Sequence, residues 1–143
     1  MSQKIRFNLL NNMVNGRQKG ASFERTICNA LQEDLNVKAA KRDLEQYRSA
    51  DRGDILIDDE SFPYTIECKR YKKGSWLQSW WDQVDKAAKV ANKEPVLVYK
   101  FDRQPIRVVM RLEHLMRDNT EQGLKVELNW EAFCYVAREN WNS

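Results

Sequence analysis

The stretch of sequence that decides the fold runs from Gly53 to Lys69. It opens with Gly53-Asp54-Ile55-Leu56-Ile57 and closes with Tyr64-Thr65-Ile66-Glu67-Cys68-Lys69. Both runs are rich in aliphatic and β-branched residues, and residues 58–63 between them are typical of a turn. The pattern predicts two strands joined as a hairpin.

Side chains alternate across a strand, so the second run has two different faces. Glu67 and Lys69 are expected on one face, and Ile66 and Cys68 on the other, apolar face. If Asp54 begins the partner strand, its carboxylate approaches Glu67. Two acids and an ammonium would then share a small volume, which favours the binding of a cation.

Length and composition favour a single domain. With 143 residues and 42% hydrophobic content, the chain is long enough to bury one core but hardly two. We expect one domain over residues 1–143, with an amino-terminal arm (1–15), a core (16–110) that carries the acidic cluster, and a carboxy-terminal extension (111–143). The formal net charge of +3 does not by itself indicate a polyanionic partner, but a basic cluster, Lys69-Arg70-Tyr71-Lys72-Lys73, directly follows the acids.

The cysteines and the apolar segments bear on the compartment. Three cysteines, at 28, 68 and 134, lack the spacing of a metal finger, and their odd number does not suit a closed disulfide framework. No apolar run approaches the roughly 18 residues that a membrane span requires. We expect a cytoplasmic protein in a reducing compartment with no membrane partner.

The remaining patterns alternate between helical and extended periodicity. Residues 1–15 suit either a short helix or an arm on a partner subunit, and residues 16–20 are predicted to form a flexible basic loop. Helices are predicted over residues 23–35, 76–92 and 112–118, strands over 37–40, 95–99, 106–110 and 124–128, and an amphipathic segment over 130–138. This order predicts an α/β fold with a small central mixed sheet flanked by helices.

Several of these residues together resemble the PD-(D/E)xK nuclease superfamily. The resemblance lies in Glu24 on the first helix, Gly53-Asp54 opening one strand, and Glu67-Cys68-Lys69 on the next. More narrowly, Lys19-Gly20 followed by Glu24-Arg25 is similar to the opening of the archaeal-type Holliday junction resolvases. The resemblance covers roughly residues 16–100 and implies a restriction-endonuclease-like core. Gly53 stands where the superfamily often has proline.

The resemblance implies metal-dependent hydrolysis of DNA, and the residue types suit that chemistry. Mg²⁺, for which Mn²⁺ can substitute, prefers oxygen ligands, which Asp54, Glu67 and the backbone carbonyl of Cys68 would supply. Glu24 would contact the ion indirectly or help to hold a second ion; alternatively, it is an acid near a helix amino terminus. Lys69 would orient the attacking water or stabilise charge, because an ammonium beside two acids keeps its proton.

The predicted DNA contacts are basic side chains around this site. Each could instead be a solvated charge or half of an ion pair, and for Arg25 the two interpretations weigh about evenly. The residues are Lys19, Arg25, Arg42, Arg48, Arg70, Lys72 and Lys73. Gln83 faces either the site, as an accessory residue, or solvent. Trp76, Trp80 and Trp81 suit a core or an interface better than base stacking.

The function expected from these features is a Holliday junction resolvase that cuts four-way DNA as a homodimer. Its compact chain would suit a bacteriophage, and the protein would then act in the host cytoplasm. The alternatives are a PD-(D/E)xK nuclease of another specificity (nicking repair, restriction-like or end-processing), a non-catalytic DNA-binding protein, and a scaffold that uses the tryptophan helix.

Overall fold

A four-stranded mixed sheet forms the centre of the molecule. The computed structural model describes residues 3–38, 41–43, 53–116, 118 and 121–141, with side chains described from residue 18 onwards. The sheet has the order β3 (Tyr64–Tyr71), β4 (Glu94–Phe101), β5 (Arg107–Arg111) and β6 (Lys125–Asn129). β3 and β4 are parallel, whereas β4–β5 and β5–β6 are antiparallel. The predicted α/β architecture with a mixed central sheet is confirmed.

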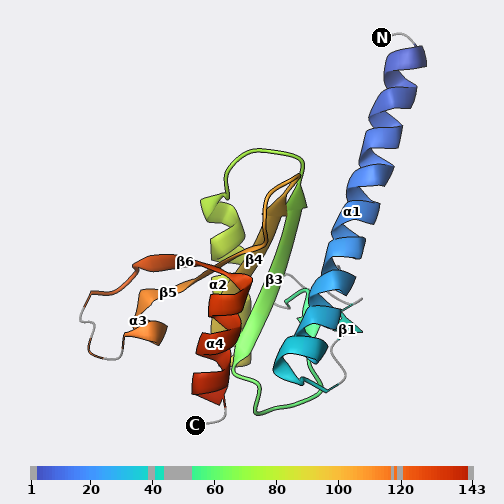
Figure 1. Cartoon of the computed structure of the whole chain (residues 1–143). Coiled ribbons are helices and arrows are strands. Elements are labelled where there is room, and N and C mark those ends of the chain that lie inside the picture. Colours follow the sequence, from blue (N-terminus) through green and yellow to red (C-terminus); the bar gives the residue numbers. More distant parts are fainter. Residues whose placement is uncertain (1–2, 39–40, 44–52, 117, 119–120, 142–143) are drawn as a thin grey trace.

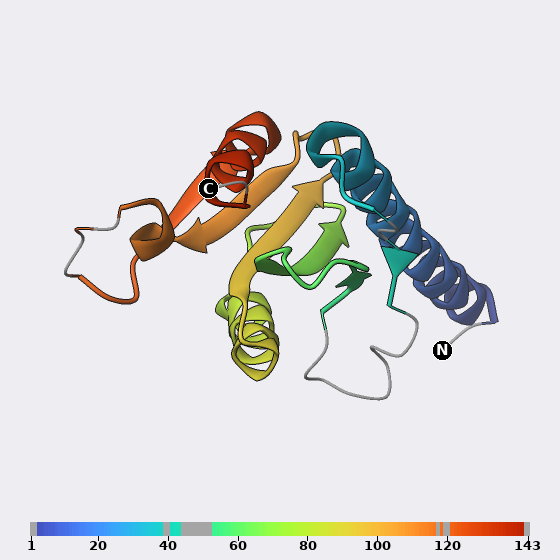
Figure 2. The ribbon, with the colours of Figure 1, turned by 90° about the horizontal axis from the view of Figure 1, so that it is seen from below.

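Helices cover both faces of the sheet. Helix α1 (Gln3–Leu35) and helix α4 (Trp130–Trp141) lie on one face, and α2 (Gln78–Ala91), which connects the parallel strands β3 and β4, lies on the other (Figure 2). A short helix, α3 (Leu112–Leu115), follows β5. Among the described residues, none of the helices combines the length and the apolar character needed to cross a membrane.

Each face of the sheet has its own buried core, as the alternation of side chains requires. On the α1 and α4 face, Ile66 and Cys68 of β3 pack with residues of both helices, such as Ile27 and Phe133. The core on the α2 face consists of Trp80, Trp81, Val84, Leu97, Tyr99 and Val109, with Trp76 and Phe101 packed against it. Trp80 and Trp81 are therefore core residues, and the core interpretation of these two tryptophans is confirmed.

The first helix is longer than the sequence pattern predicts. α1 is continuous from Gln3 to Leu35, so the flexible loop predicted at residues 16–20 is wrong. Glycine in a helix interior costs only about 1 kcal/mol relative to alanine, and the residues between Gly16 and Gly20 are good helix formers. Glu24 consequently lies well inside the helix, and the interpretation of it as an acid at a helix amino terminus is also wrong. The amino-terminal half of α1 extends past the sheet (Figure 1).

The predicted hairpin is also corrected. Strand β2 (Ile55–Leu56) pairs with β1 (Lys41–Arg42) in a separate two-stranded antiparallel sheet, and not in a ladder with β3. A single backbone hydrogen bond, from Asp54 N–H to Ile66 O at 2.9 Å, joins this segment to β3. The strand predicted at residues 37–40 begins later, at Lys41; residues 39–40 lie outside the described part of the chain.

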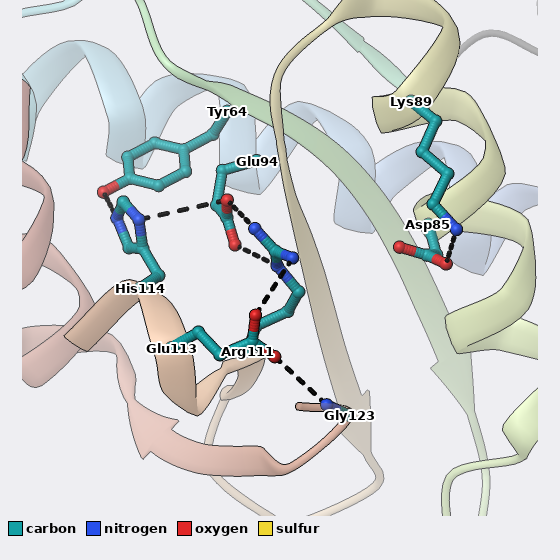
Figure 3. Close-up of polar contacts among 8 residues, drawn as sticks. All are labelled: Tyr64, Asp85, Lys89, Glu94, Arg111, Glu113, His114 and Gly123. Carbon is teal, nitrogen blue, oxygen red and sulfur yellow. Dashed lines mark hydrogen bonds and ion pairs between the residues drawn. The ribbon is translucent and has the colours of Figure 1, made fainter. Parts of the chain in front are cut away.

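A polar network fixes the amino-terminal ends of β3 and β4 (Figure 3). Tyr64 Oη and His114 Nε2 are hydrogen-bonded at 2.8 Å, and Arg111 donates two 2.7 Å hydrogen bonds to Glu94. The imidazole of His114 also faces Glu94, with 4.0 Å between Nδ1 and Oε2. This network ties α3 to the sheet at the end of β3 that lies away from Lys69.

Candidate active site

The segment that carries Asp54 is held to β3 by its backbone and by its side chain. Asp54 N–H donates to Ile66 O, and Asp54 C=O accepts from Asp43 N–H, both at 2.9 Å. Its carboxylate oxygen Oδ2 accepts a 2.6 Å hydrogen bond from the backbone N–H of Cys68. Asp54 is therefore fixed beside Glu67 although β2 and β3 form no ladder.

Gly53 allows this close approach. A Cβ at position 53 would lie 2.9 Å from the backbone oxygen of Ile66 and 2.9 Å from Cγ2 of Thr65. A backbone oxygen cannot swing aside as the end of a long side chain can. The glycine that stands where the superfamily often has proline is thus required by the packing of residues 53–54 against β3.

Glu67 is 1% exposed and lies opposite Leu97 in the sheet, so its side chain is on the α2 face. Among the described atoms, its oxygen Oε2 is buried and has no hydrogen-bond partner while both acids are ionised; when the pair holds a proton, Glu67 donates it to Asp54. A buried acceptor without a partner costs about 1–3 kcal/mol, and more when it is charged. The site therefore keeps one carboxylate oxygen available for a ligand.

The two acids perturb each other strongly. Burial, followed by the charge of Asp54, raises the pKa of Glu67 to about 9. Burial also raises the pKa of Asp54 to about 6, although the hydrogen bond from Cys68 N–H opposes that rise. Two carboxylates in a poorly solvated volume disfavour double ionisation, so at neutral pH the pair holds a proton unless a cation takes its place.

Lys69 follows Glu67 on the same face of β3. Its ammonium nitrogen Nζ lies 3.7 Å from Glu67 Oε1 and donates a 3.0 Å hydrogen bond to Oε1 of Gln83 on α2. Of the two orientations left open for Gln83, the structure has the one that faces the site. The amide fixes the ammonium beside the acids.

Glu24 approaches the pair from α1. It is 8% exposed, and its charge contributes to the raised pKa of both Asp54 and Glu67. Its Oε2 accepts a 2.6 Å hydrogen bond from Nε of Arg42 on β1. Arg42 thus neutralises a buried acid beside the site, a contact that the sequence pattern did not reveal.

The oxygens at this position suit a hard divalent cation. The N–H and C=O of one strand residue point to the same edge; Cys68 N–H reaches Asp54, so the Cys68 carbonyl lies on the same edge. Two carboxylates and this carbonyl are the ligand types that Mg²⁺ accepts, with water or phosphate completing its coordination. Within the part of the chain that the structure describes, no three His, Cys, Asp or Glu side chains are arranged to hold one ion. Any ion would therefore depend on the carbonyl and on substrate or water.

The basic residues predicted to contact DNA fall into two groups. Lys19 and Arg70 converge on Asp102, at 2.9 Å and 2.5 Å from its Oδ1. Asp102 follows Lys19 by 83 residues, so local spacing could not predict this pairing. Arg25, Lys72 and Lys73 are exposed, and Arg48 lies outside the described residues.

A mixed sheet flanked by helices, with an aspartate and a Glu-x-Lys strand at one position, is the arrangement of a PD-(D/E)xK nuclease. A model of the family described as "Phage putative PDDEXK endonuclease" matches residues 15–140. The chain belongs to this family and is therefore a PD-(D/E)xK nuclease.

One solved structure supports the fold. The chain is similar to Archaeoglobus fulgidus Hjc, a Holliday junction resolvase from an archaeal hyperthermophile, with a TM-score of 0.54 and 20% sequence identity. The match covers 82% of this chain and 98% of that chain. No curated protein matches the sequence closely enough to count as a relative.

Proposed function

We propose that the protein is a Mg²⁺-dependent endonuclease that cuts four-way DNA junctions as a homodimer, that is, a Holliday junction resolvase. The observation that carries the catalytic part is the buried, unpartnered Oε2 of Glu67 beside Asp54 and Lys69. A stable protein does not bury such an oxygen without a partner unless something else offsets the cost.

Each residue has a separate part in this proposal. Asp54, Glu67 and the carbonyl of Cys68 would hold the ion, which would activate a water and neutralise phosphoryl charge. Lys69, held by Gln83, stabilises the charge that develops on the phosphate or orients the water. Glu24, neutralised by Arg42, supports the segment that carries Asp54 and acts without touching the substrate.

The choice of substrate rests on the likeness to Hjc and on symmetry. A four-way junction has two-fold symmetry, and its symmetric cleavage needs two active sites related by a dyad, which a homodimer supplies. The amino-terminal half of α1 extends past the sheet (Figure 1) and is the first segment to test as a dimer contact. The tryptophan helix is a weaker candidate because Trp80 and Trp81 are already buried in its own core.

The test is a cleavage assay on labelled four-way junctions, flaps, nicked duplexes and linear duplexes with Mg²⁺, Mn²⁺ or EDTA. We expect paired symmetric nicks on junctions alone, abolished by EDTA and by Asp54→Asn or Glu67→Gln. The matched control is Glu60→Gln, which makes the same chemical change at an exposed position of the turn before β3.

Other outcomes would refute parts of the proposal. Equal cutting of all substrates would contradict junction specificity and would favour a nuclease of different specificity. Tight junction binding with no cleavage under any metal would contradict catalysis. A monomeric mass on the junction, measured by light scattering, would contradict the dimer.

A further inference from the structure

A second feature lies beyond Lys69, outside the acidic site. A surface pocket of about 370 Å³ forms where the loop after β3 meets the ends of β4 and β5. This volume is at the lower end of the range of small-ligand sites, about 300–1,000 Å³. Its lining is basic and aromatic and includes Lys72, Lys73, Trp76, Phe101, Gln104 and Arg107.

The inner wall of the pocket is aromatic. Trp76, Tyr99 and Phe101 line it, with the rings of Tyr99 and Phe101 edge to face at 5.5 Å between centroids. The Tyr99 hydroxyl donates to Glu127 and the residue is only 5% exposed, so Tyr99 supports the wall and offers little surface to a ligand. Trp76 and Phe101 are only half buried. These two rings therefore offer surface to a flat, apolar group.

The rim of the pocket is basic. Lys72 and Lys73 are exposed, and neither forms an ion pair with any described residue. Arg107 lies 3.3 Å from Glu127. Asp102, the acid of the lining, is held by Lys19 and Arg70, which offset its charge. The rim is thus complementary to a phosphodiester backbone.

The pocket lies at the carboxy-terminal end of β3, on the same face of the sheet as the acidic site. Glu67 and Lys69 are opposite Leu97 and Tyr99 in the sheet, so they share the α2 face with the aromatic wall. Lys72 follows Lys69 by three residues, about 10 Å at the rise of an extended chain. At 3.4 Å per base step along the helix axis, this distance spans about three stacked nucleotides.

We propose that this pocket takes an unpaired nucleobase of the substrate strand, a few nucleotides from the scissile phosphate. The inference rests on the proposed function, because it assumes DNA as the substrate. Aromatic rings stack on any base, lysines follow the backbone, and the Gln104 amide offers a donor and an acceptor to a base edge. A base paired within a duplex cannot enter; a four-way junction supplies a base to the pocket only where a pair opens at the point of strand exchange.

The test uses wild-type protein and Phe101→Leu in EDTA, so that binding is measured without cleavage. The probes are a duplex with a short unpaired stretch carrying 2-aminopurine and a fully paired duplex of the same length. For wild type we expect quenching of 2-aminopurine on binding. Phe101→Leu should weaken binding of the first probe about tenfold or more and abolish the quenching, because base–aromatic stacking is lost. Its affinity for the paired duplex should stay within about twofold of wild type.

The control is Tyr135→Leu, which removes an exposed aromatic ring from α4 on the opposite face of the sheet. It should change neither affinity. Phe101 packs against the core of the α2 face; if Phe101→Leu fails to fold, Gln104→Ala, at an exposed position, removes the amide offered to a base edge and tests the same selectivity. Equal weakening of both probes, or no quenching by wild type, would overturn the inference.

The outcomes separate this inference from the proposed function. If wild type binds and quenches the unpaired probe but cuts no DNA with Mg²⁺ or Mn²⁺, the nucleobase pocket stands and the resolvase proposal falls. If wild type cuts junctions and the pocket variants bind the unpaired and the paired probe with equally changed affinity, the resolvase proposal stands and the nucleobase pocket falls.

Discussion

The carboxylate of Asp54 is hydrogen-bonded to the backbone N–H of Cys68, at 2.6 Å. Because Cys68 stands between Glu67 and Lys69, this one contact sets the position of the aspartate relative to both residues. The backbone bonds of Asp54 to Ile66 and Asp43 hold the same segment from two sides. The geometry of the acidic pair therefore depends on how closely residues 53–54 approach β3.

We predict that Gly53→Ala lowers both stability and activity. The new Cβ would meet the Ile66 oxygen at 2.9 Å, and overpacking of this kind typically costs about 1–3 kcal/mol. Thermal unfolding and cleavage rate are the measurements. The control is Gly20→Ala, where nothing lies within 4 Å of the new Cβ; in a helix interior it should stabilise by about 0.5–1 kcal/mol. A Gly53→Ala protein with wild-type stability and cleavage would contradict the requirement for close approach.

We predict that Glu67→Gln stabilises the metal-free protein, and more so as pH rises. A carboxyl whose pKa is raised by folding binds its proton more tightly in the folded state than in the unfolded state. Its contribution to stability is therefore present at a pH below its ordinary pKa of 4.5 and is lost as the pH rises towards its folded pKa of about 9. Glutamine has no such loss. In EDTA, the free energy of unfolding of the variant, measured by chemical unfolding, should exceed that of wild type by a difference that grows between about pH 5 and about pH 8.5 and reaches about 1–3 kcal/mol. The exposed Glu60→Gln should show no such trend, and a difference that shrinks with pH would refute the assignment.

The sequence predicted the contents of the site better than its surroundings. Alternation along β3 correctly placed Ile66 and Cys68 in the core and Glu67 with Lys69 on the other face, because a period of two is a local property. The pairing of β2 with β1 was not predictable in the same way. Two-residue strands carry almost no pattern, and the partner depends on the close approach that Gly53 permits.

Contacts between segments far apart in the sequence could not be predicted from residue spacing. The pairing of Arg42 with Glu24 and of Lys19 with Asp102 joins residues from different elements, and no spacing rule connects them. Gly16 and Gly20 are typical of a loop, but the helix propensity of the residues around them outweighs the cost of two glycines, so α1 continues through both.

We predict that Lys69→Met lowers the single-turnover cleavage rate and leaves DNA affinity nearly unchanged. Loss of one preorganised cation or donor at a developing charge typically costs about 10²- to 10³-fold in rate. Gln83→Ala, which frees the ammonium by removing its 3.0 Å partner, should have a smaller effect in the same direction. The control, Lys89→Met, removes an exposed lysine from α2. If Lys69→Met weakens binding and spares the rate, the lysine is only a phosphate contact.

We predict that Arg42 acts through Glu24 and not through DNA. Arg42→Met would leave the buried Glu24 carboxylate without this cation, and breaking a buried pair costs about 3 kcal/mol or more. The double variant Glu24→Gln with Arg42→Met should regain most of that stability, measured by chemical unfolding. A variant with normal stability and a reduced salt dependence of DNA binding would instead favour the direct phosphate contact that the sequence suggested.

We predict that Asp102→Asn strengthens DNA binding. Asp102 holds Lys19 and Arg70, and removing its charge frees both cations for phosphates while keeping the shape of the side chain. Each additional phosphate contact steepens the slope of log K against log salt by about 0.9, so the slope should steepen by about 1–2. Anisotropy titrations at several salt concentrations measure this directly. Asp85→Asn, which breaks the single pair with Lys89 on α2, is the matched control and should not steepen the slope to the same extent. A weaker affinity for Asp102→Asn would mean that Asp102 positions these two cations for DNA instead of competing with it.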